Sequence, residues 1–292
     1  MIQPVSTVPQ VVGVFDPATH TVSYVVADPA AGAAAIIDPV LDFDPTAART
    51  STGSVERLLD LIAERGWRLE RVLETHAHAD HLTGADEIRV RTGAPIGIGE
   101  RIKQVQKTFG DLFEASDVTP DARAFDQTFA DGDRFRLGEM EVEVLHTPGH
   151  TPACVSYRIG DAVFVGDTLF MPDYGTARCD FPGGDARTLH RSIQKLLALP
   201  DATRVFVGHD YLPQGRGAFA WETSIGAQKA ENIHIGGGRS EDDFVALREA
   251  RDATLSPPQL MLTALQINIR AGALPPAAPS GRRFLKTPLN AI

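Results

Sequence analysis

The chain has 292 residues, of which 43% are hydrophobic and 23% charged, enough for the core of one α/β domain or of a domain with an extension. Its net charge of −10 argues against nucleic acid or an anionic membrane as a general partner, because both need a basic surface. No apolar run approaches the roughly 20 residues that span a bilayer. With no signal-peptide pattern and only two cysteines, we expect a cytoplasmic location.

The first half of the chain is expected to alternate between short strands and amphipathic helices. Apolar runs and helical spacing predict strands at 22–27, 33–38 and 71–74, a short apolar run at 94–98, and helices at 51–65, 84–92 and 99–109. The strand at 71–74 leads directly into a cluster of histidines.

The second half repeats this order, which predicts two similar halves packed as layers. We expect strands at 134–137, 141–146, 154–159, 162–166 and 204–207, a long polar loop at 168–184, and a helix at 186–199. Beyond about residue 215 the pattern is helical, with a glycine hinge at 236–238. The Pro-rich stretch 271–292 is expected to wrap the surface.

Histidine or aspartate side chains follow four of the predicted strands. They are found in the segment 75–81 and at His150, Asp167 and His209. Strand ends that meet at one rim are where α/β proteins assemble sites, so we expect these side chains to converge. Imidazole nitrogen and carboxylate oxygen suit Zn, Fe and Mn.

The segment Thr75-His76-Ala77-His78-Ala79-Asp80-His81 is the strongest of these signals. Three imidazoles and a carboxylate so close together are hard to bury for packing alone, since each needs a polar partner. A solvated loop in which Asp80 caps the next helix is the simpler alternative. It leaves His150, Asp167 and His209 without an explanation, so we predict a metal centre.

Residues 76–81 resemble the HxHxDH motif of the metallo-β-lactamase superfamily, and His150, Asp167 and His209 resemble its companion ligands. The resemblance covers roughly residues 20–215. It implies an α/β fold, the αββα four-layer sandwich with metal at the rim of its two sheets. We divide the chain into a catalytic domain, 1–235, and a C-terminal helical and Pro-rich extension, 236–292. The fold alone does not determine the reaction.

A finer resemblance is to the persulfide dioxygenases. Residues 150–155 resemble that family's GHTPGCV segment with Ala153 in place of glycine, 175–181 its GxxRxDF loop, and 209–211 its HDY segment. Residues 173–185 and 266–272 look closest to a bacterial subgroup known as β-lactamase hydrolase-like.

This second resemblance implies one Fe(II) per chain, held by His76, His150 and Asp167. It further implies that glutathione persulfide, or a similar persulfide, is oxidised by O₂ to sulfite and thiol in sulfide detoxification. By the same resemblance, Arg178 and Tyr211 are candidates for binding the substrate, Arg178 through a carboxylate. A structural Arg178–Asp180 pair and a half-buried tyrosine are the alternative.

His78, Asp80, His81 and His209 are candidates for a second metal site. In a dioxygenase they would orient ligands and waters instead. The main alternative function is a thioester hydrolase similar to glyoxalase II, with two Zn(II) or mixed metals. A non-catalytic metal or redox sensor would not need the substrate loop, and the β-lactamase subclass with a cysteine ligand would need cysteine near Asp167. The Pro-rich tail could also exchange contacts across a homodimer.

Overall fold

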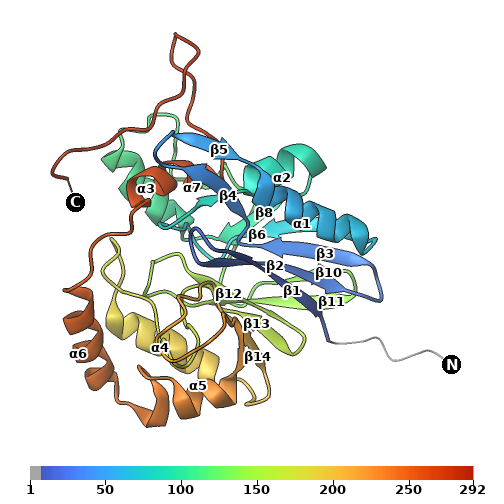
Figure 1. Ribbon diagram of the computed structural model, residues 1–292, viewed down its shortest axis with the longest axis vertical. Helices are drawn as coiled ribbons and strands as arrows, with labels where there is room; N and C mark the ends of the chain where they lie inside the picture. The colour runs from blue at the N-terminus through green and yellow to red at the C-terminus, as the bar shows by residue number, and fades with distance from the viewer. Residues whose placement is uncertain (1–7, 292) are drawn as a thin grey trace.

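Two six-stranded sheets face each other, with helices on their outer faces (Figure 1), in a computed structural model that describes residues 8–291. The first sheet has the order β1 (Gln10–Asp16), β2 (Thr21–Asp28), β3 (Ala33–Ile37), β6 (Arg68–Leu73), β8 (Ile96–Gly99), β9 (Gln127–Phe129). The second has the order β10 (Arg134–Leu137), β11 (Met140–His146), β12 (Val155–Ile159), β13 (Ala162–Phe164), β14 (Arg204–Phe206), β15 (Glu222–Ser224). A small sheet pairs β4 (Val40–Asp44) with β5 (Arg49–Ser51) and β7 (Leu82–Thr83).

Alternation along β2 shows why the sheets stack. Val22, Tyr24 and Val26 enter the core between the two sheets, where they meet β11 and β12. Val25 and Ala27 point the other way, into the core beneath the helices. The helices of this first outer layer are α1 (Gly53–Glu64), α2 (Ala85–Thr92) and α3 (Ile102–Leu112).

The second sheet is covered in the same manner. Val163 and Val205 pack with Leu189 and Ile193 of α4 (Ala186–Leu197), beside α5 (Ile225–Glu231) and α6 (Glu241–Asp252). Helix, sheet, sheet and helix layers therefore follow one another, which confirms the expected αββα sandwich.

The structure corrects several expected boundaries. The helix expected at 99–109 begins three residues later, because β8 continues to Gly99, which pairs with Phe129 of β9. The sequence analysis also missed β1, β9, β15 and the β4–β5 hairpin. These strands lie at sheet edges or in the small sheet, where exposure on one side removes the continuous apolar run that marks a buried strand.

The C-terminal extension contacts both halves of the sandwich. The single-turn helix η1 (Gly236–Gly238) precedes α6, which packs against α4, whereas α7 (Met261–Asn268) lies beside α3 and β7 (Figure 1). The division at residue 235 stays a prediction. Within residues 8–291, no helix combines the length and the apolar character needed to cross a membrane.

Gly149 sets the approach of the β11–β12 loop to α4. Its φ of +133° is unfavourable for other residues, and an added Cβ would lie 2.3 Å from the backbone N and Cα of Leu189. The next residue is His150, so this close approach fixes where that imidazole can lie.

We expect Gly149→Ala to lower the free energy of unfolding by at least about 3 kcal/mol, because α4 or the loop must shift. Gly132→Ala is the matched control, since Gly132 also has positive φ but has no atom near the added methyl group. It should cost only about 1 kcal/mol. Urea unfolding measures both values, and equal losses would contradict this account of Gly149.

Candidate metal centre

Three buried side chains from three strand ends converge at the rim of the sandwich. His76 follows β6, His150 follows β11 and Asp167 follows β13. Asp167 Oδ2 lies 3.9 Å from His76 Nε2 and 3.6 Å from His150 Nε2. One ligand atom from each residue lies within 4.8 Å of the others, so one ion could contact all three. The structure thus brings together the expected triad.

Hydrogen bonds orient both imidazoles for metal binding. The Thr75 hydroxyl donates to Asp38 Oδ2 (2.8 Å), which leaves its oxygen to accept from His76 Nδ1 (3.0 Å). His150 Nδ1 donates to the Arg178 carbonyl oxygen at 2.8 Å. In both rings the proton is then on Nδ1, and the Nε2 lone pair faces Asp167.

The protonation states of the triad fit a metal ion. Burial lowers the pKa of His76 well below its ordinary value, which keeps the imidazole neutral. Its Nε2 is buried and has no hydrogen-bond partner among the described residues. A buried acceptor without a partner is costly, and a cation bound beside Asp167 would satisfy it. Two nitrogens and one carboxylate oxygen match the 2-His-1-carboxylate triad of non-haem iron sites.

His209 holds the other oxygen of Asp167. Its Nδ1 lies 2.7 Å from Asp167 Oδ1, and its Nε2 lies 2.6 Å from Asp80 Oδ2. Although burial opposes it, Asp167 and Asp80 raise the pKa of His209 to about 10. The same pairing holds the pKa of each carboxyl below its ordinary value, again against the effect of burial. His209 is therefore a cation between two carboxylates.

His78 turns away from the triad. Its Nε2 lies 3.2 Å from Asp38 Oδ1 and 3.6 Å from Glu74 Oε2. Although burial opposes protonation, Asp38 and Glu74 raise the pKa of His78 well above its ordinary value. His78 also forms a compact group with Asp80 and His81, so two arrangements of possible ligands meet at this residue.

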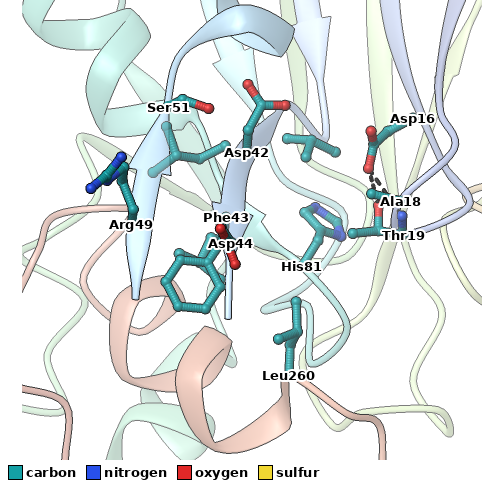
Figure 2. A pocket seen from close by; sticks show the side chains of 13 residues that line it. Asp16, Ala18, Thr19, Asp42, Phe43, Asp44, Arg49, Ser51, His81 and Leu260 are labelled. Atoms are coloured by element: carbon teal, nitrogen blue, oxygen red, sulfur yellow. Dashed lines mark hydrogen bonds between the residues drawn. The ribbon is translucent and has the colours of Figure 1, made fainter. Parts of the chain in front are cut away.

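His81 lies on the wall of a different cavity, of about 390 Å³. Figure 2 shows its ring among Thr19, Asp42 and Leu260, beneath the β4–β5 hairpin. Its Nδ1 lies 3.2 Å from the Thr21 hydroxyl and 3.4 Å from Asp80 Oδ2. This cavity shares Ala18, Thr19 and Leu260 with the cavity that His150 and Asp167 line.

Two members of the triad, His150 and Asp167, line a cavity of about 360 Å³, a size suited to a small organic ligand. His150 and Asp167 are at its buried end, and Phe170, Tyr174 and Tyr211 form an aromatic wall. The expected substrate-binding residues Arg178 and Tyr211 both line it. Burial raises the pKa of Tyr211 well above its ordinary value, so its hydroxyl stays protonated and can donate.

Arg178 is already engaged with the protein. Its guanidinium contacts both carboxylate oxygens of Asp180 at 2.5 Å and donates to the Ser256 carbonyl oxygen at 2.7 Å. The loop pair that the sequence left as an alternative is thus formed. The backbone carbonyl of Arg178 orients His150, and no side-chain pattern in the sequence could indicate this role.

Sequence reasoning also missed Asp38 and Asn268. Asn268, at the end of α7, donates to the carbonyl oxygens of His78 and His81, both at 2.8 Å, and accepts from the Thr83 N–H at 2.9 Å. Asp38 ends the strand expected at 33–38, and Asn268 lies in the segment 266–272 that resembles the bacterial subgroup. Neither pattern indicated that these side chains hold the histidine loop.

Known proteins resemble this chain over most of its length. A probable metallo-hydrolase of Burkholderia pseudomallei is 50% identical over 96% of this chain and 99% of that protein. A beta-lactamase hydrolase-like protein of Agrobacterium fabrum is 50% identical over 98% of this chain, which spans only 66% of that longer protein.

Similarity to persulfide dioxygenases is lower. The human mitochondrial persulfide dioxygenase ETHE1 is 32% identical over 68% of this chain and 66% of its own length. The crystal structure of ETHE1 from Myxococcus xanthus matches with a TM-score of 0.73 at 32% identity, covering 90% of this chain and all of that one. The model of the metallo-beta-lactamase superfamily matches residues 16–209, two thirds of the sequence. The chain therefore belongs to the metallo-beta-lactamase superfamily.

Proposed function

We propose that the protein is a mononuclear non-haem iron persulfide dioxygenase that acts on glutathione persulfide or a similar small persulfide. In the overall reaction O₂ oxidises the terminal sulfur to sulfite, the S–S bond breaks, and the thiol leaves with a proton. Water supplies the oxygen of sulfite that O₂ does not. A cytoplasmic location and a homodimer stay predictions from the sequence.

The contacts of His78 and Asp80 are the observations that most favour one metal over two. His78 Nε2 faces Asp38 Oδ1 (3.2 Å) and Glu74 Oε2 (3.6 Å), and binding of a second ion through this nitrogen would require the ring to leave both. Asp80 would also have to give up its 2.6 Å bond to His209.

Separate groups of residues would hold the metal, orient its ligands and form the cavity wall. His76, His150 and Asp167 would hold the iron, which when bound supplies open positions for O₂ and the persulfide sulfur side by side. His209 keeps Asp167 ionised and fixed in orientation. Phe170, Tyr174 and Tyr211 restrict water at the buried end of the cavity, and the Tyr211 hydroxyl can donate to the substrate.

A dinuclear hydrolase of glutathione thioesters is the second candidate. One observation favours it: ligand atoms of His78, Asp80 and His81 lie within 4.8 Å of one another beside the triad. The Burkholderia relative, named a probable metallo-hydrolase, is consistent with it. The two candidates differ in metal count and in the need for O₂, so both can be tested on one preparation.

For the first test, the protein is purified without oxygen, its metals are counted, and O₂ uptake is followed with glutathione persulfide. We expect one iron per chain and O₂ consumption that depends on the persulfide. Two zinc ions per chain, no O₂ uptake, and hydrolysis of S-lactoylglutathione would show that the hydrolase candidate is right.

Asp167→Ala should lose the metal and the activity together, because it removes one of three ligands and leaves the His209 cation unpaired on that side. Iron content should fall at least about 10-fold. The control Asp201→Ala removes an exposed carboxylate far from the site and should keep the metal. Full iron in the Asp167 variant would remove this residue from the ligand set.

His78→Gln separates the two candidates. Glutamine can still donate to Asp38, and if His78 is no ligand the iron content stays near that of the parent protein. We expect activity to fall by about 10- to 100-fold, the range seen when groups behind a ligand are altered, while a metal-saturated sample keeps one iron per chain. In a dinuclear enzyme the same change would remove one of two metal equivalents, as metal analysis of the purified variant would show.

A further inference from the structure

The cavity lined by His150 and Asp167 has positively charged side chains that are not all paired with negative ones. Three arginines line it, and two of them are neutralised by protein partners. Arg178 is paired with Asp180, and the buried Arg248 is paired with Asp252 (2.6 Å) and donates to the Thr176 carbonyl oxygen (3.0 Å).

Arg251 is the third arginine, in the last turn of α6, and it is exposed. Within residues 8–291, no carboxylate lies at ion-pair distance from its guanidinium, and no oxygen accepts a hydrogen bond from it. The carboxylates of the same cavity, Asp80 and Asp167, are at the buried end and bonded to His209. The outer part of the cavity therefore has one uncompensated positive charge.

We infer that Arg251 binds an anionic group of the substrate, a carboxylate of the thiol carrier, while the sulfur end reaches the triad. This rests on the proposed function, because the triad determines which end of the ligand is buried. A guanidinium offers two parallel N–H donors to a carboxylate. The net charge of −10 repels anions at long range, so a local cation is needed to hold one.

This placement also distinguishes Arg251 from Arg178. Changing Arg178 would leave Asp180 unpaired and break contacts with the loop before α7, so its effects would mix folding with binding. Arg251 has no such contacts, and its removal should leave the fold unchanged. Arg239→Ala is the control, because Arg239 is a partly exposed arginine of the same extension that does not line the cavity and makes one side-chain hydrogen bond, to the Ile233 carbonyl oxygen (3.3 Å).

The test is calorimetric titration of metal-loaded protein with S-methylglutathione and with its dimethyl ester, neither of which can react as a persulfide. For the acid we expect Arg251→Ala to weaken binding roughly 3- to 10-fold, and Arg251→Lys to weaken it less. Added salt should weaken binding to the parent protein more than to Arg251→Ala. For the ester, and for Arg239→Ala, binding should match that of the parent protein.

Equal weakening for acid and ester, no change in the Arg251 variants, or no binding to the parent protein would each overturn the inference. With glutathione persulfide as substrate, Arg251→Ala should raise KM by a similar factor at unchanged kcat. If persulfide-dependent O₂ uptake is absent but the binding difference persists, the proposed function fails and the role of Arg251 stands.

Discussion

The site depends on satisfying the buried backbone of the histidine loop. Residues 75–79 lie in the interior without regular secondary structure. The Thr75 carbonyl accepts from the Val155 N–H of β12 (2.9 Å), and other peptide groups of the loop need side-chain partners. Asp38 accepts from the Thr75 N–H at 2.7 Å and from its hydroxyl, and Asn268 donates to the carbonyls of His78 and His81. One partner follows β3 and the other ends α7, so the loop is held from opposite ends of the chain.

The side chains that hold the loop also affect the charges of the neighbouring histidines. Asp38 both anchors the loop and faces His78, and so it favours a cation at the position where a second metal would need a neutral ligand. His209 has the corresponding place on the other side, between Asp80 and Asp167. Each of these two buried imidazoles faces two acidic side chains, although burial raises the pKa of Glu74 to about 7. The triad lies between these two charge clusters, with His76 neutral.

The sequence predicted the sandwich and the convergence of the triad because both follow from local signals. Apolar alternation marks the strands, and strand ends that deliver His76, His150 and Asp167 must meet at one rim. Three features could not be predicted. The turning of His78 toward Asp38 depends on a side-chain rotation inside a loop. His150 donates to a backbone oxygen, that of Arg178, and Asn268 contacts His78 across 190 residues of sequence.

Enzymes that catalyse different reactions share this fold, so the reaction must depend on the contacts and charges of the residues that they have in common. Here Asp38, behind the loop, faces His78 Nε2 at 3.2 Å and favours the protonated form of this imidazole. The C-terminal extension acts at two further points: Asn268 fixes the loop, and α6 contributes cavity wall with a free guanidinium. In the proposed enzyme, Arg251 would add recognition from α6 to a reaction carried out at the triad. A change at this exposed side chain would then alter substrate preference without removing any bond to the triad.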